Sequence, residues 1–118
     1  SFMYGSAAMV NAEGVTAQIA FGMDHNYKCE LEVWGSKGTV YTNRILTAPA
    51  GLVPEVVIRK GNEEEKRNLP ADDAFKKSIL HFCKCIEDAN TRKANYETLL
   101  RQASLVEQFK QLAHIDVK

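Results

Sequence analysis

The chain has 118 residues, of which 45% are hydrophobic and 25% are charged, and its 15 basic side chains balance its 15 acidic ones. This length and composition predict one globular domain and exclude a disordered chain. A net charge of zero disfavours general binding to nucleic acid or to an anionic membrane. No apolar run approaches the roughly 20 residues that a transmembrane helix requires.

The three cysteines, Cys29, Cys83 and Cys85, are an odd number, whereas disulfide frameworks usually hold an even number. Cys83 and Cys85 do not resemble a zinc pair, because residues two apart on a helix point in nearly opposite directions. We therefore expect structural thiols and a reducing cytoplasmic location. The chain begins at Ser1 rather than at Met, which indicates an engineered chain or a piece of a longer protein.

The first part of the chain has the period-two alternation that is typical of β-strands. Residues 7–10 predict a first strand, and residues 15–21 predict a second strand with one apolar face. Residues 27–44 predict a β-hairpin, in which the turn at residues 35–38 ends on a glycine that can adopt positive φ. We expect these four strands to form an antiparallel meander.

The next segment mixes loop and strand signals. Residues 45–54 contain two prolines and predict a loop or a crossing. Residues 55–60 predict a fifth strand, residues 61–65 an acidic turn, and residues 66–69 a short sixth strand.

The pattern then changes to the 3.6-residue period of helices. Residues 70–73 predict a helix start, after which an apolar stripe runs along one face: Phe75, Ile79, Phe82 and Ile86. This helix is predicted to end near residues 88–90, and a second one to cover residues 94–113. The second stripe comprises Tyr96, Leu99, Leu100, Ala103, Val106 and Phe109. The predicted fold is α+β: a mostly meandering antiparallel sheet of about six strands, with two amphipathic helices on one face.

Composition, periodicity and spacing identify no active site. Gly35 and Gly38 join two strands, whereas a phosphate loop joins a strand to a helix. His81 is predicted to lie beside the core and His114 to be exposed, so neither suggests a site. His25 lies in a predicted loop at a strand end, where functional residues are often found. No catalytic residue, cofactor-binding motif or metal site is therefore assigned from these patterns.

The hairpin residues 27–40, together with residues 44–49, resemble the C-terminal domain of the Gfo/Idh/MocA oxidoreductases. Residues 14–22 are similar to the strand that precedes this hairpin in the family, and the two predicted helices are similar to its closing helices. The resemblance covers about residues 5–113. The start of the hairpin and the segment after Arg44 look nearest to nucleotide-sugar ketoreductases and to dihydrodiol-type dehydrogenases.

The resemblance implies that residues 1–118 are the substrate-binding and oligomerisation domain of an NAD- or NADP-dependent sugar or polyol oxidoreductase. It also implies a Rossmann domain and a Glu-Lys-Pro motif, neither of which is present in this sequence. We therefore expect this chain alone to bind no dinucleotide and to have no dehydrogenase activity. The alternative is a non-catalytic sheet module that serves self-association or sugar binding.

Tyr27, Lys28 and Arg44 flank the predicted hairpin and are the candidate substrate-binding residues. Their phenol, ammonium and guanidinium groups suit a hydroxyl-rich or phosphorylated ligand, such as a sugar or a nucleotide-sugar. The alternative is that Lys28 and Arg44 are solvated charges and that Tyr27 contributes only to packing.

A homodimer is expected on the sheet face that the helices leave open. Trp34 carries this prediction, because a large aromatic side chain on a polar face favours an interface. The predicted interface comprises Thr16, Gln18, Glu30, Glu32 and Trp34. The alternative is that Trp34 packs beneath residues 45–54.

Overall fold

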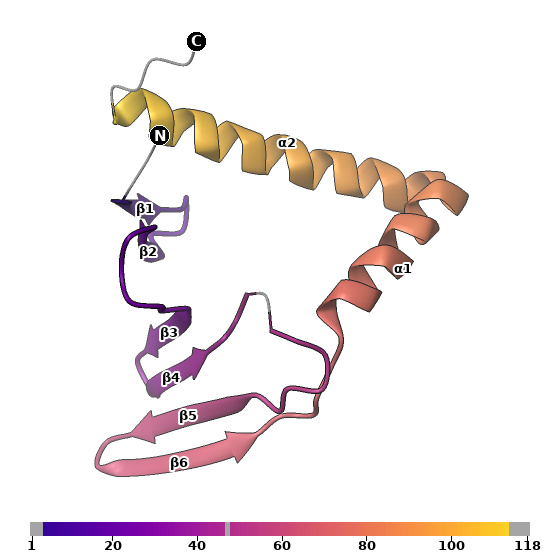
Figure 1. Ribbon diagram of the computed structural model, residues 1–118. Helices are drawn as coiled ribbons and strands as arrows, with labels where there is room; N and C mark the ends of the chain where they lie inside the picture. The colour runs from indigo at the N-terminus through magenta and orange to yellow at the C-terminus, as the bar shows by residue number, and fades with distance from the viewer. Residues whose placement is uncertain (1–3, 47, 114–118) are drawn as a thin grey trace. The chain divides into compact units, whose positions relative to one another are not determined.

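A computed structural model describes residues 4–46 and 48–113, so His114 lies outside the described residues. Six strands are followed by two helices (Figure 1). This element order confirms the predicted α+β class, the six strands and the two helices. The chain divides into two compact units, residues 1–26 with 93–118 and residues 27–92.

The first unit contains a two-stranded antiparallel sheet of β1 (Tyr4–Val10) and β2 (Thr16–Gly22). The turn between them is organised by Asn11, whose side-chain oxygen accepts hydrogen bonds from the backbone N–H groups of Glu13 and Val15 at 3.0 and 2.9 Å. Gly14 has a φ of 85°, which an L-residue with a Cβ rarely adopts. This turn forms where the sequence predicted the end of the first strand.

An aromatic contact joins this hairpin to the helical part of the same unit. Gly5 pairs with Phe21 across the two strands, and a Cβ atom on Gly5 would lie only 2.6 Å from the Phe21 ring. The Phe21 ring therefore occupies the space above the glycine. Its centroid lies 5.9 Å from that of Phe109, within the range of favourable aromatic pairs.

The second unit contains a four-stranded antiparallel sheet in the order β3-β4-β5-β6. Its strands are β3 (Glu30–Gly35), β4 (Gly38–Asn43), β5 (Glu55–Lys60) and β6 (Glu63–Asn68). The predicted hairpin is confirmed, with Val33 opposite Val40 and Gly35 opposite Gly38. Val40 in turn pairs with Ile58, so apolar side chains line up across three strands on one face.

The strands differ from the prediction in two respects. They form two sheets, one of β1 and β2 and one in the order β3-β4-β5-β6, rather than one continuous meander. Strand β6 also begins at Glu63, although residues 61–65 were predicted to be a turn. Gly61, with a φ of 58°, reverses the chain in two residues, so Lys60 pairs directly with Glu63.

Helix α1 (Ala74–Glu87) begins where the sequence predicted a helix start. The N-cap residue Asp73 accepts a 3.0 Å hydrogen bond from the backbone N–H of Lys76, as a capping carboxylate should.

Helix α2 (Ala89–Leu112) begins five residues earlier than predicted, because Asp88 serves both helices. Its N–H donates to the Lys84 carbonyl at 2.9 Å and ends α1. Its carboxylate accepts bonds from the Thr91 hydroxyl at 2.6 Å and the Asn90 N–H at 3.1 Å, which begin α2. These bonds, the Thr91 bond first, hold the pKa of Asp88 below its usual value.

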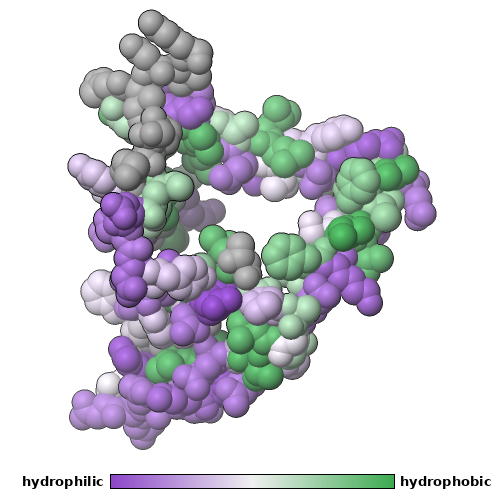
Figure 2. All heavy atoms as spheres, in the orientation of Figure 1, coloured by the Kyte–Doolittle hydropathy of each residue, from purple (hydrophilic) through white to green (hydrophobic). Residues whose placement is uncertain are grey.

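The apolar stripe of α1 is exposed in the described structure, which differs from the prediction of a buried stripe. Its four members, Phe75, Ile79, Phe82 and Ile86, are 58–65% exposed, and hydrophobic side chains are visible along α1 in Figure 2. Among the described residues the closely packed pairs of elements are the strand pairs β1–β2, β3–β4, β4–β5 and β5–β6. Most of the α2 stripe is exposed in the same way.

Within residues 4–46 and 48–113, neither helix combines the length and the apolar character that crossing a bilayer requires.

Candidate functional site

The candidate site is a group of side chains at one end of the β3–β4 hairpin, named here the strand-end cluster: Tyr27, Lys28, Glu30, Tyr41 and Arg44. Glu30 pairs with Asn43, so the residues just before β3 and just after β4 meet at the same end of the hairpin. The Arg44 N–H extends this pairing by donating to the Cys29 carbonyl at 2.6 Å. Antiparallel pairing thus brings together all three residues predicted to bind substrate.

Arg44 and Tyr27 are in direct contact. The guanidinium carbon of Arg44 lies 5.5 Å from the centroid of the Tyr27 ring, which is a cation–π geometry. Arg44 has a φ of 53°, and it is the non-glycine residue with positive φ in the described chain. Such a conformation is uncommon for a residue with a Cβ atom and is often found at ligand-binding positions.

Lys28 belongs to a second set of contacts within the cluster. Its ammonium nitrogen lies 2.7 Å from a carboxylate oxygen of Glu30, and the Tyr41 hydroxyl donates to the other oxygen. These bonds, the Lys28 bond first, lower the pKa of Glu30. The same carboxylate raises the pKa of Lys28 and of Tyr41, in each case chiefly through the hydrogen bond.

The two sets of contacts differ in whether the charges that they contain are paired. The Glu30 charge is balanced by Lys28, whereas Arg44 forms no ion pair with any described residue. The cluster therefore presents one uncompensated cation beside a phenol ring, an arrangement that favours an anionic or hydroxyl-rich ligand. Sequence reasoning missed Tyr41, although Tyr41 lies opposite Glu32 and diagonally across from Glu30 in the hairpin register.

Trp34 lies on the same strand face as Glu30 and Glu32, because alternate residues of a strand share a face. It is 88% exposed, so the described residues 45–46 and 48–54 do not cover it, contrary to the alternative interpretation of the sequence. Thr16 and Gln18 lie in β2, in a different sheet and a different unit from Trp34. The predicted interface therefore draws on both units and stays a prediction.

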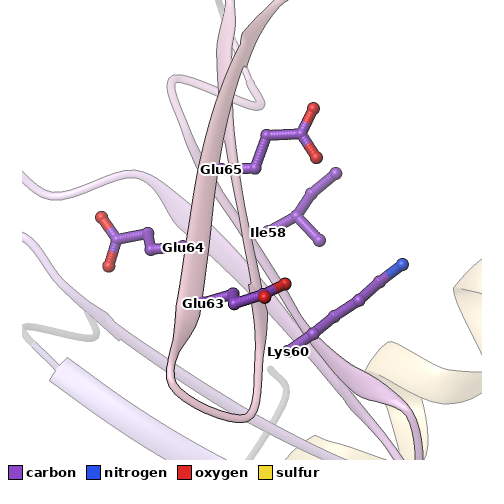
Figure 3. A pocket seen from close by; sticks show the side chains of 5 residues that line it. All are labelled: Ile58, Lys60, Glu63, Glu64 and Glu65. Carbon is purple, nitrogen blue, oxygen red and sulfur yellow. The ribbon is translucent and has the colours of Figure 1, made fainter.

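Two surface hollows lie elsewhere in the second unit. One, of about 340 Å³, is lined by five residues of the β5–β6 hairpin: Ile58, Lys60, Glu63, Glu64 and Glu65. Figure 3 shows the Glu64 side chain on the opposite side of the hairpin from those of Glu65 and Ile58, as strand alternation requires. The other, of about 430 Å³, lies beside the start of α1 and includes Asp72, Asp73, Lys76 and Lys77. Neither contains a histidine, a cysteine or a serine.

The remaining candidate residues have structural surroundings. His25 packs against Gly22, where a Cβ atom would lie 2.2 Å from its ring, and forms an edge contact with Tyr4 at 6.5 Å. His81 contacts the buried Cys85 thiol at 3.6 Å, one helical turn away. None of the three cysteines forms a disulfide bond: Cys29 is half-buried, Cys83 is exposed and Cys85 is buried. No group of three metal-binding side chains occurs in the described part of the chain.

The described residues do not fit a dinucleotide. Such a cofactor places its pyrophosphate at a glycine-rich turn between a strand and a helix. Here the turn at residues 35–38 connects β3 to β4, and the strand that precedes α1 is β6, which has no glycine.

The comparisons with known proteins point to one group of enzymes. No protein-family model matches the chain. A dTDP-3,4-didehydro-2,6-dideoxy-alpha-D-glucose 3-reductase from Actinomadura kijaniata is 41% identical over 103 residues, which are 87% of this chain and 31% of the relative. The enzyme of the same name from Streptomyces violaceoruber is 32% identical over 110 residues, covering 86% of this chain and 32% of the relative.

The structural comparison agrees with the sequence comparison. A mutant of KijD10, a 3-ketoreductase from Actinomadura kijaniata in complex with TDP-benzene and NADP, aligns with a TM-score of 0.83 at 40% identity, over 89% of this chain and 33% of that one. A second mutant of the same enzyme aligns with a TM-score of 0.84 over 90% of this chain and 34% of that one. The chain thus spans about a third of the length of these relatives. Its homologues are dTDP-sugar 3-ketoreductases.

Proposed function

We propose that this chain is the C-terminal, substrate-binding part of an NADP-dependent nucleotide-sugar 3-ketoreductase of the Gfo/Idh/MocA type. The observation that carries the proposal is the 41% identity over 103 residues to a dTDP-sugar 3-reductase. The TM-score of 0.83 to the KijD10 complex with TDP-benzene and NADP supports it.

In this proposal the strand-end cluster contributes to the substrate site through Tyr27, Lys28 and Arg44. The contacts of the cluster support this assignment, because they place a phenol ring and a guanidinium group side by side. The family resemblance implies that NADP and the proton-transfer groups belong to the other part of the enzyme, and the described residues provide no phosphate loop between a strand and a helix.

The direct test is an assay of the whole protein. NADPH oxidation is followed by absorbance with a dTDP-linked 3-keto sugar as substrate and with an unlinked sugar as control. Turnover that depends on the dTDP-linked substrate supports the proposal, whereas turnover of neither substrate contradicts it.

The cofactor assignment is tested with the 118-residue chain by itself. Calorimetric titration with NADPH is expected to show no binding by this chain and binding by the whole protein. Micromolar binding of NADPH to the chain alone would place a cofactor site within these residues.

A second function, self-association, is favoured by the exposure of Trp34. A Trp side chain that is 88% exposed on a sheet face has a strong tendency to be buried in an interface. We propose a homodimer that buries Trp34 together with Glu30 and Glu32, its neighbours on the same face of β3. In sedimentation equilibrium, Trp34→Glu is expected to shift the dimer toward monomer, while Trp34→Phe retains it. A wild-type monomer at tens of micromolar would contradict the proposal.

A further inference from the structure

The Tyr27–Arg44 pair holds a guanidinium group at an aromatic ring and leaves its N–H donors without an ion-pair partner among the described residues. The guanidinium carbon of Arg44 lies 5.5 Å from the centroid of the Tyr27 ring, which places the cation over the ring face. A cation–π contact is an electrostatic attraction to the ring and requires no hydrogen bond from the guanidinium, so the N–H donors stay available for a ligand. Among the described residues no carboxylate pairs with Arg44.

The backbone of Arg44 is also held in place. Its φ of 53° is combined with a 2.6 Å hydrogen bond from its N–H to the Cys29 carbonyl. A residue in the left-handed region directs its side chain differently from a regular strand residue, and here the guanidinium lies over Tyr27. Both ends of the residue are therefore positioned before any ligand arrives, which lowers the entropic cost of binding.

Lys28 has a different role, although it is next to Tyr27 in the sequence. Its ammonium group is bound to Glu30 at 2.7 Å, and Tyr41 donates to the same carboxylate. This pairing balances the negative charge of Glu30, which would otherwise repel an anion. Lys28 therefore reduces the repulsion between the Glu30 carboxylate and an anionic ligand, while Arg44 remains available to bind that ligand.

We infer that Arg44 binds the diphosphate of a nucleotide-sugar through its free N–H edge, that Tyr27 positions Arg44, and that Lys28 neutralises Glu30. The inference rests on the proposed function, which supplies a substrate with a diphosphate. Guanidinium binds phosphate oxygens in a bidentate manner, whereas a sugar hydroxyl has no charge to balance. The ligand is assigned to the substrate, and the phosphates of NADP are the competing source of the same chemistry.

The test measures the binding of dTDP, thymidine and NADPH to the whole protein by calorimetry. Arg44→Ala is expected to weaken dTDP binding by about 10- to 100-fold, the range for a lost charge-assisted hydrogen bond. The affinities for thymidine and NADPH should change by less than about threefold. Arg67→Ala is the matched control, because Arg67 is an exposed arginine of the same unit that pairs with Glu65.

Further variants separate the roles of the cluster residues. Glycine at position 44 adopts a positive φ without strain, so Arg44→Gly is expected to fold normally. If Arg44→Gly loses dTDP affinity as Arg44→Ala does, the loss is due to the missing guanidinium and not to misfolding. Tyr27→Leu should weaken dTDP binding by about two- to fivefold and Tyr27→Phe should restore it, because only the ring is needed. Lys28→Met should weaken it less than Arg44→Ala.

Each contrary outcome has a distinct meaning. Unchanged dTDP affinity in both Arg44 variants overturns the inference, and so does an equal loss of thymidine affinity. A loss of NADPH affinity without a loss of dTDP affinity assigns Arg44 to the cofactor and overturns it too. A wild-type protein that binds neither dTDP nor NADPH instead refutes the proposed function.

Discussion

Gly38 is the position where the β3–β4 hairpin is most sensitive to a single added carbon. A Cβ atom there would lie 2.5 Å from the backbone oxygen of Arg59 and 3.1 Å from Cγ of Lys60. The Lys60 side chain can rotate away, but the Arg59 oxygen belongs to strand β5, which is paired with β4. Relief of the clash therefore requires β4 and β5 to separate by several tenths of an ångström.

Gly38→Ala is expected to lower the free energy of unfolding by about 1–3 kcal/mol, the range for overpacking a closely packed position. Gly35→Ala is the matched control at the other end of the same turn, because its Cβ would lie 3.6 Å from the nearest atom, the Gly38 oxygen. That variant should be neutral or more stable by up to about 1 kcal/mol, since alanine restricts the unfolded chain.

The assay is urea unfolding of both variants, followed by far-UV circular dichroism, with thermal unfolding as a second measurement. A loss of 1 kcal/mol corresponds to a fall in Tm of about 4–8 °C for a unit of 60–100 residues. If Gly38→Ala unfolds at the same urea concentration as Gly35→Ala, with equal slopes, the close approach of β4 and β5 at this turn is refuted.

Three further outcomes are expected. Arg44→Ala should be less stable than Arg44→Gly by about 1 kcal/mol in urea unfolding, because a φ of 53° strains any residue with a Cβ; the reverse order would contradict this. Asp73→Ala should cost about 1 kcal/mol through loss of the bond to the Lys76 N–H while Asp73→Asn retains most of it, and equal urea midpoints for the two variants would exclude the cap. The pKa of Glu30, followed by NMR, should lie below its ordinary value of 4.5, so that its contribution to stability is present above that pH and is lost as the pH falls through the lowered pKa. Lys28→Met should raise this pKa toward 4.5, and an unchanged pKa would exclude the ion pair.

The strands and helices were predictable where local signals were strong. The β3–β4 hairpin follows from the alternation of residues 28–33 and from the glycines of its turn, and α1 follows from its apolar period and its capping aspartate. A short sixth strand was predicted at residues 66–69, but its start at Glu63 was not, since residues 63–68 are all charged or amide side chains without period-two alternation. The early start of α2 depends on one residue, Asp88, capping two helices at once.

The candidate site was predictable in part. The position of Tyr27, Lys28 and Arg44 beside the hairpin was enough to predict that they lie at the same end of it. The different contacts of these three residues were not predictable. They depend on the positive φ of Arg44 and on the hydrogen bond from Tyr41 to Glu30 across the hairpin. These are properties of backbone geometry and register, which the composition of a segment does not determine.

The charged strand β6 has a consequence for how this sheet meets other chains. The outer strand of a sheet carries unpaired N–H and C=O groups that can recruit a foreign strand, and natural proteins protect such edges with charge. Five consecutive charged residues, Glu63 to Arg67, lie on β6. In β3, at the other edge, Glu30 and Glu32 alternate with Leu31 and Val33, and Trp34 follows. A strand from a second molecule is therefore deterred at β6 by charge on both of its faces. Growth of the sheet into an aggregate would start at β3.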